Sequence, residues 1–289
     1  MAKVEQLPIA PETIKNGALT ELEHVSDVVQ MLSPNDWSRP SAVAGWTVGE
    51  VVAHLDLFIG MYGRFLGIIL AGGAGSSAIT NLIGWLTSSV LPSAAPAFDA
   101  GNATIPKIMD RLLTREQLKR QFSAGAQRAR ERLLQIDSHD SSRAGDFQGG
   151  PYPLEFYLGI FVNELALHTW DIEVAINDTA NLSDAARGIL PWFYWSVTRL
   201  MFRPPRRSRG TVQVVLTEPE AVMWWSMADG FARPGRATIT ADAEVRGPSG
   251  TFVLALAGRI SPAGAMQSSL SVNGDRGLAE QFLRSWHLI

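Results

Sequence analysis

The sequence of 289 residues contains no cysteine. This absence excludes disulfide bonds, thiolate metal ligands and a cysteine nucleophile at the same time. If sulfur chemistry takes place on this protein, a small-molecule thiol must supply the sulfur. A metal ion would be held by histidine, aspartate and glutamate, a ligand set that suits zinc or another divalent ion with an open coordination position.

Charge of either sign is also scarce. Charged residues make up 18% of the chain and hydrophobic residues 46%, and the net charge is −3. This is the balance of a folded globular protein, and it gives no reason to expect nucleic acid or an anionic membrane as a partner. The N-terminal segment has acids and prolines in place of the apolar core of a signal peptide. The sequence therefore predicts a soluble, cytoplasmic protein, and no feature predicts an oligomeric state.

A long uninterrupted apolar run is missing as well. The most apolar region, residues 55–91, is broken by Arg64, by the glycine-rich AGGAGSSA and by Asn81. No run of about 20 apolar residues is left for a membrane helix. We interpret the region as a buried helix followed by an apolar hairpin or lid, within an insertion at about residues 67–100.

Apolar residues recur at helical spacing through the first two thirds of the chain. Three long amphipathic helices are predicted over residues 12–32, 115–136 and 153–177. Thr47 and Glu50 have the spacing of a capping box, which predicts the start of another long helix. Four such helices predict a bundle, with a further helix from Ser183 to about Phe202 beside it. Residues 137–146 are predicted to be a polar loop.

The pattern of the sequence changes from helical periodicity to short strand-like segments at RPPRRSRG, residues 203–210. This basic and proline-containing segment is typical of a domain boundary. Beyond it, strands are predicted over residues 210–216, 221–228, 236–245 and 268–274, and helices over 249–258 and 275–286. The fold class that we predict is an α bundle plus an α+β domain. The predicted domains are residues 1–204 and residues 210–289.

Three residues of the predicted bundle have the chemistry of a metal site. His54 lies one turn after the capping box on an apolar helix face, so it points into the bundle. Glu164 and His168 are four residues apart within an apolar stripe and therefore lie one above the other. A carboxylate there is costly unless it is paired, and a metal shared with His54 would satisfy all three groups. Asp171, about one turn later, is placed to orient His168.

The same spacing has simpler interpretations. A Glu/His pair at this distance is also a helix-stabilising side-chain pair, and a single inward histidine is commonly a hydrogen-bonded core residue. Trp46 is most simply a hydrophobic staple or core residue, and Glu50 a helix cap. Spacing alone does not decide between these and a metal site.

Two segments together resemble a known family. DWSRPSAVAGWTVGEVVAHLD (36–56) and NELALHTWDIEVA (163–175) resemble the two signatures of the mycothiol-dependent maleylpyruvate isomerase family, which belongs to the DinB-like metal-binding bundles. VRGPSGTFVLALAGRI (245–260), followed by SVNGD, is similar to the C-terminal domain of this family, which is related in fold to sterol carrier proteins. The resemblance covers nearly the whole chain in order.

The resemblance implies a divalent metal, usually zinc, bound by His54, Glu164 and His168. It also implies mycothiol as a low-molecular-weight thiol cosubstrate, a small-molecule substrate, and an arginine of the C-terminal domain in the site, for which Arg259 is the best match. An arginine beside a helix C-terminus is equally an ordinary surface residue. The insertion at 67–100 departs from the family, because it is longer, more apolar and adds no arginine after Arg64 for a doubly anionic substrate.

Three functions compete at this stage. The leading hypothesis is a metal-dependent, thiol-using isomerase or S-transferase that acts on a small electrophile. The alternative is a non-catalytic protein that binds a hydrophobic ligand, motivated by the apolar residues 55–91 and by the carrier-like C-terminal domain. Metal-activated hydrolysis ranks third, because the sequence shows no separate general base.

Overall fold

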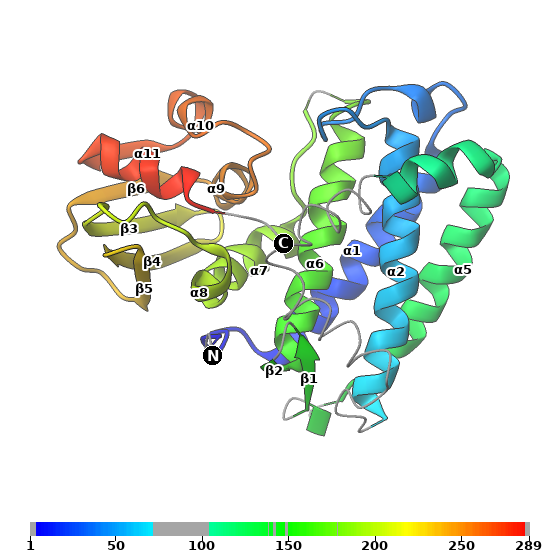
Figure 1. The fold of residues 1–289 in the computed structure, drawn as a ribbon, viewed down its shortest axis with the longest axis horizontal. Coiled ribbons are helices and arrows are strands. Elements are labelled where there is room, and N and C mark those ends of the chain that lie inside the picture. The colour runs from blue at the N-terminus through cyan, green and yellow to red at the C-terminus, as the bar shows by residue number, and fades with distance from the viewer. Residues whose placement is uncertain are drawn as a thin grey trace. The chain divides into compact units, whose positions relative to one another are not determined.

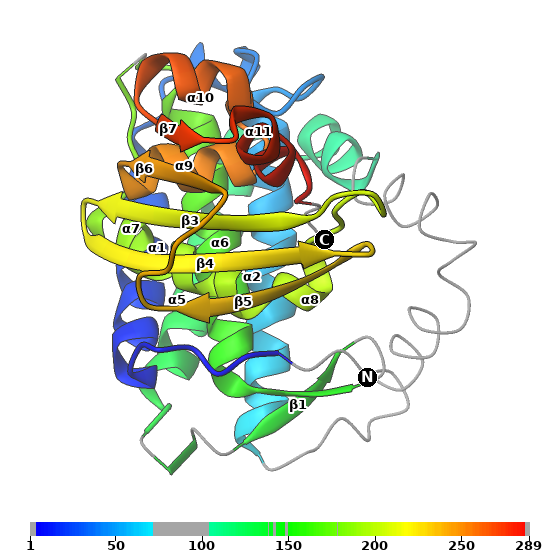
Figure 2. The same ribbon diagram turned by 90° about the vertical axis from the view of Figure 1, so that its left-hand side faces the viewer.

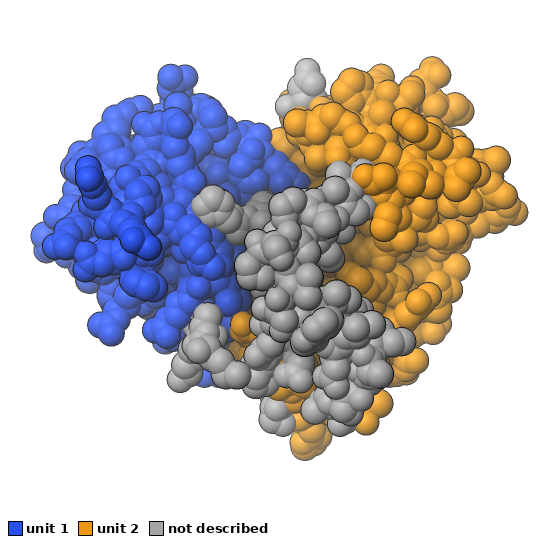
Figure 3. Space-filling model, viewed as in Figure 1, with its two compact units in different colours: residues 1–9, 181–289 blue, residues 10–180 orange. Residues whose placement is uncertain are grey.

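The computed structural model describes residues 4–71, 104–137, 139–140, 143–147, 150–177 and 179–286. The chain forms two compact units (Figures 1 and 3): a helical unit of residues 10–180, and a sheet unit of residues 1–9 and 181–289. The predicted fold class, an α bundle plus α+β, is confirmed. The segment 203–210 lies inside the sheet unit, and the limits 1–204 and 210–289 stay a prediction. The predicted insertion lies mostly outside the described residues.

Four long helices build the helical unit: α1 (Pro11–Met31), α2 (Val48–Leu70), α5 (Arg115–Leu134) and α6 (Leu154–Glu173). Helices α1 and α2 each pack against both α5 and α6, as Figure 1 shows from the side. All four predicted bundle helices are therefore present, with ends that differ by a few residues from the predicted ones. Between them the core is almost entirely aliphatic and aromatic.

The start of α2 is fixed by the predicted capping box. The Glu50 backbone N–H donates to the Thr47 hydroxyl, and the Thr47 N–H donates to the Glu50 carboxylate at 2.8 Å. The box satisfies two of the donors that a helix N-terminus leaves free. Because His54 lies on the second turn after this cap, the box also sets the position of His54 along the helix.

Among the described residues, α2 is long and apolar enough to cross a membrane by length and composition alone. It is nevertheless a core helix of the bundle, packed between α5 and α6. It buries Asp56, whose carboxylate accepts a hydrogen bond from Gln121 at 2.5 Å. Burial raises the pKa of Asp56, against the opposing effects of Gln121 and of the Arg128 charge.

The last three residues of the predicted polar loop, residues 144–146, belong to a strand of a hairpin instead. Strands β1 (Ala144–Phe147) and β2 (Gly150–Pro153) pair in an antiparallel register. A Cβ on Gly145 would lie 2.9 Å from Cδ1 of Ile69, so α2 and the hairpin touch at this glycine, and a larger residue would require the Ile69 side chain to shift. The Tyr157 hydroxyl donates to the Gly145 carbonyl at 2.6 Å and ties the hairpin to α6.

The sheet unit contains a five-stranded sheet of order β5-β4-β3-β6-β7 (Figure 2). Its strands are β3 (Gly210–Thr217), β4 (Glu220–Ala228), β5 (Phe231–Arg236), β6 (Ala243–Gly247) and β7 (Ser271–Gly274). Only the β3–β6 pair among them is parallel. The predicted strand 236–245 is wrong in its first part. The Asp242 carboxylate accepts from the Thr211 N–H at 2.7 Å, and β6 begins after it.

Helices complete this unit: α7 (Asp184–Ser196), α8 (Thr198–Met201), α9 (Ser249–Leu256), α10 (Pro262–Ser268) and α11 (Arg276–Arg284). The single helix predicted from Ser183 to about Phe202 is wrong, because Val197 leaves the helical conformation and separates α7 from α8. Helix α11 packs on β3, β6 and β7. Trp225, Phe252 and Phe282 form the aromatic centre of this unit.

The capping box allows a direct test of local stability. Replacing Thr47 by alanine removes the hydroxyl acceptor at the start of α2, and we expect the free energy of unfolding to fall by about 1 kcal/mol. Thr20→Ala is the matched control, because its exposed hydroxyl donates only within α1 and caps no helix. Chemical denaturation of the three proteins measures the difference. Equal destabilisation by both substitutions would contradict the assigned role of the box.

Candidate metal centre

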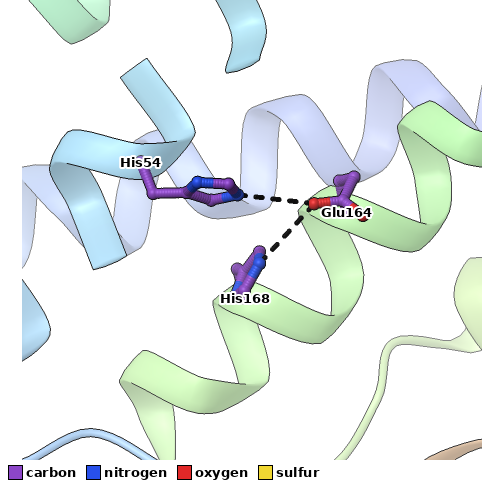
Figure 4. A group of neighbouring side chains, drawn as sticks. All are labelled: His54, Glu164 and His168. Carbon is purple, nitrogen blue, oxygen red and sulfur yellow. Dashed lines mark ion pairs between the residues drawn. The ribbon is translucent and has the colours of Figure 1, made fainter. Parts of the chain in front are cut away.

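Two helices bring the three predicted ligands together. His54 extends from α2, and Glu164 and His168 extend from α6, where they are four residues apart. The Nε2 atoms of the two histidines each lie 3.5 Å from the same oxygen, Oε2 of Glu164 (Figure 4). One possible ligand atom from each residue lies within 4.8 Å of the other two. This is the spacing that one small cation could bridge.

The triad lies on the accessible stripe of α6. Every residue from Leu154 to Ile172 is buried except Ile160, Glu164 and His168, which follow one another at intervals of four. The side chains of the triad are 13–20% exposed: 17% for His54, 20% for Glu164 and 13% for His168. The three ligands are thus held by a rigid core helix and its neighbour, and small molecules can still reach them.

His54 supplies the strongest geometric argument for a metal ligand. Its Nε2 atom is buried and makes no hydrogen bond, and its neighbour Oε2 of Glu164 lies at ion-pair distance, 3.5 Å. A buried polar atom without a hydrogen bond is costly, and such an atom calls for a specific explanation. Imidazole nitrogen is a good ligand for zinc and related ions. The donor set of two imidazoles and a carboxylate therefore fits a divalent metal, which would provide the missing partner.

Asp171 takes the supporting position that was predicted for it. Its side chain is fully buried, and its Oδ2 lies 2.8 Å from Nδ1 of His168. This contact turns the opposite nitrogen, Nε2, toward Glu164. A histidine that binds a metal typically makes such a contact to a carboxylate or carbonyl through its other nitrogen. Asp171 would therefore orient His168 without touching the ion.

The charges of the site depend on one another. Burial alone would raise the pKa of Glu164, but the two neighbouring histidines, His168 and His54, outweigh it and lower that pKa well below its usual range. Burial lowers the pKa of His168, whereas Asp171 and Glu164 raise it, to about 9 overall. Without a metal, the proton on His168 thus offsets part of the negative charge of the two carboxylates.

Arg259 is not brought together with the triad by any described contact. It lies in the sheet unit just after α9, where its guanidinium donates to the Ala257 carbonyl at 3.2 Å. Gly258 before it has a φ of +69°, so α9 ends at the predicted glycine. The role of Arg259 in the site stays a prediction.

Sequence reasoning missed one neighbour of the site. Trp46, interpreted as a staple or core residue, has its ring edge-on to that of His54, with ring centroids 5.7 Å apart and planes at 77°. It is only partly buried. The position of Trp46 directly before the capping box did not predict its contact with His54, because the side chain is oriented by a loop that follows no periodic pattern.

Comparisons with known proteins agree with this architecture. Residues 18–173 match a family model described as the mycothiol maleylpyruvate isomerase N-terminal domain, and residues 196–281 match the MDMPI C-terminal domain. The crystal structure of the mycothiol-dependent maleylpyruvate isomerase is 13% identical with a TM-score of 0.58, over 92% of this chain and 93% of that one. The crystal structure of a mutant of that enzyme is 14% identical with a TM-score of 0.57, and it covers the same shares of both chains. At this identity the likeness shows the fold. No curated protein matches the sequence.

The proton balance of the site can be measured on metal-free protein. We expect the imidazole of His168 to titrate near pH 9 by NMR. In Asp171→Asn the pKa should be lower, because the carboxylate that stabilises the imidazolium is gone. The raised pKa stabilises the fold fully below about pH 6.5, and this contribution is lost as the pH rises through 9. The stability advantage of wild type over Asp171→Asn should therefore shrink over that range. A His168 pKa that is unchanged in the variant would contradict this account.

Proposed function

Since this chain belongs to the mycothiol maleylpyruvate isomerase family, as its two signatures predicted, we propose that it is a metal-dependent enzyme in which mycothiol isomerises a small electrophilic substrate or is transferred to it. The observation that carries the proposal is the convergence of His54, Glu164 and His168, with a buried Nε2 atom of His54 that lacks a hydrogen bond. The absence of cysteine agrees with it, because the sulfur then has to come from a cosubstrate.

His54, Glu164 and His168 would hold the metal, and zinc suits this donor set. With three protein ligands an ion of this kind keeps a position open, and it lowers the pKa of a thiol that binds there. The residues of the chain provide the setting for this chemistry. Asp171 holds His168 in one orientation, and Glu164 contributes a negative charge that partly neutralises a divalent ion.

The proposed reaction is a thiol addition. The thiolate sulfur forms a bond to the electrophilic carbon of an unsaturated carbonyl compound, and the π electron pair moves onto the carbonyl oxygen. Rotation about the new single bond, followed by return of the electron pair and expulsion of the thiolate, gives the isomer and regenerates the thiol. If a proton is instead delivered to the α-carbon, the sulfur stays attached and the product is a thioether.

Arg259 has a place in this proposal. A guanidinium that reaches the substrate would stabilise the developing enolate oxygen through charge-assisted hydrogen bonds. The support for this role is the match of the C-terminal family model, which covers residues 196–281 and therefore includes Arg259.

Metal content tests the site. We expect about one equivalent of zinc in wild type purified without chelator and none in His168→Ala, which removes one of three ligands and leaves Glu164 without its main partner. His139→Ala is the control, since His139 is exposed and distant in sequence from the triad. Elemental analysis gives the answer. A wild type that binds no metal even when zinc is offered would contradict the proposal and favour the alternative of a hydrophobic-ligand binding protein.

Thiol dependence tests the reaction. Metal-loaded wild type should isomerise, or attach a thiol to, cis-configured unsaturated carbonyl compounds only when mycothiol is present. We expect His54→Ala to lower the turnover by more than about a hundredfold, because the loss of a ligand removes the site of thiol activation. Chromatography of substrate, isomer and thioether follows both products. Equal rates with and without the thiol would contradict the proposed mechanism.

A further inference from the structure

Aromatic side chains border the triad. Trp46 meets the ring of His54 edge-on. Phe58 lies one turn after His54 on α2, and its ring stacks at 5.8 Å on that of Phe161, which lies one turn before Glu164 on α6. Trp46 and Phe58 are partly exposed, whereas Phe161 is fully buried. Trp46 and Phe58 thus present accessible aromatic surface near the ligands, one from the loop before α2 and one from α2 itself.

The ring of Phe58 is held in place from behind. The Tyr62 ring lies 4.9 Å from that of Phe58 and 5.1 Å from that of Phe161, and the Tyr62 hydroxyl donates to the Tyr157 carbonyl. Tyr62 itself is buried. Because the supporting rings are fixed by packing and by this hydrogen bond, Phe58 forms a pre-organised wall rather than a loose surface residue.

The accessible residues around Phe58 are apolar too. Leu57 is 37% exposed and Met61 is 60% exposed, on the same turns of α2 as Phe58. On α6, Ile160 continues the accessible stripe one turn before Glu164. Next to the three ligands, the accessible side chains of both helices are therefore mostly hydrocarbon or aromatic. The partly exposed Glu50 is an exception, and its carboxylate caps the start of α2.

The two helices that carry the triad contain one arginine, Arg64 of α2, and no lysine. No lysine or arginine occurs between Arg39 and Arg64, between Arg64 and Lys107, or between Arg143 and Arg187. Arg64 is exposed and follows His54 by ten residues, about 15 Å along the helix.

Several cations on the neighbouring helices have partners away from the triad. On α1, Lys15 donates to the Ile136 carbonyl at 3.2 Å. On α5, Arg115 pairs with Asp110, Lys119 donates to the carbonyls at the end of α1, and Arg128 acts on Asp56. Within the described part of the helical unit, no lysine or arginine contact with the triad is found.

The aromatic walls and the scarcity of cations near the triad favour one class of substrate over another. A dicarboxylate loses much hydration free energy when it is bound, and it needs arginine or lysine partners to recover it. In the described part of the helical unit, no lysine or arginine contacts the triad, where two carboxylates lie instead. Arg259, the one arginine proposed for the site, is assigned to the enolate oxygen. An uncharged ligand with an apolar body loses little hydration and gains contact with the aromatic walls, which is the usual pattern of small-molecule sites.

We propose that the triad serves an uncharged, apolar electrophile, such as an unsaturated ketone with an aryl substituent, and that Trp46 and Phe58 are the residues that determine this specificity. This inference rests on the proposed function and names the substrate class of the same site. The bonds that form and break are those of the thiol addition described above.

The test compares two substrates on the metal-loaded full chain with mycothiol. One is an unsaturated methyl ketone with a phenyl substituent, and the other is maleylpyruvate, which carries two carboxylates. We expect kcat/KM to be at least tenfold higher for the phenyl ketone. Trp46→Ala and Phe58→Ala should each lower kcat/KM for the phenyl ketone about tenfold, mainly through KM, and lower it much less for maleylpyruvate.

Controls separate specificity from damage to the site. Metal content should stay at one equivalent in both variants, and Phe231→Ala, which removes an exposed phenyl group of the sheet unit, should behave as wild type. Trp46→Phe and Phe58→Leu should restore most of the activity, because they keep an apolar wall even if the alanine variants fold poorly.

Two outcomes overturn the inference in distinguishable ways. A preference for maleylpyruvate that Trp46→Ala and Phe58→Ala leave unchanged would overturn the substrate class and leave the proposed function intact. No thiol-dependent turnover of either substrate by protein with one bound metal would overturn the proposed function, and the inference with it.

Discussion

The carboxylate of Glu164 is the constraint on which the helical unit depends. It lies within an otherwise apolar bundle, where an ionised group is tolerated only with partners of opposite charge or a metal. Both of its partners are histidines, and one of them, His54, comes from the other helix. A shift of α2 by one residue would turn His54 by about 100° away from Glu164. The capping box at Thr47 and the stacked rings of Phe58 and Phe161 fix the same register, so three independent features agree.

Helix α2 carries two polar groups that face different neighbouring helices. His54 and Asp56 are two residues apart, which places them about 200° apart around the helix axis. His54 faces α6, whereas Asp56 accepts a hydrogen bond from Gln121 of α5. The arginine that balances Asp56 is therefore on the α5 side. This division explains how an arginine-rich helix can pack beside the triad and still supply no cation to it.

The parts of the fold that follow local rules could be predicted from the sequence. Helical periodicity located the bundle helices, the Thr47/Glu50 spacing located the start of α2, and the four-residue interval placed Glu164 above His168. Contacts between distant segments could not be predicted in this way. The β1–β2 hairpin packs against α2 where Gly145 meets Ile69. The start of β6 within the predicted strand 236–245 follows the contact of Asp242 with Thr211, and the side chain of Trp46 is placed by its loop. In each case the deciding partner lies far along the chain or outside any periodic pattern.

The three proposed ligands and the accessible side chains around them are held in place in different ways. The ligands come from two core helices whose register is fixed by buried packing, so the metal-binding geometry tolerates little change. The walls are different. Trp46 precedes the cap and supplies no ligand, and Phe58, Leu57 and Met61 are partly or largely exposed. Substitutions at Trp46, Leu57 or Met61 would alter the proposed substrate surface without moving the Glu164 carboxylate, whereas Phe58 also helps to fix the register of α2. Under the proposed function, the substrate could therefore change through these accessible positions alone, because the free energy that holds the ligands comes from the buried side of the same helices.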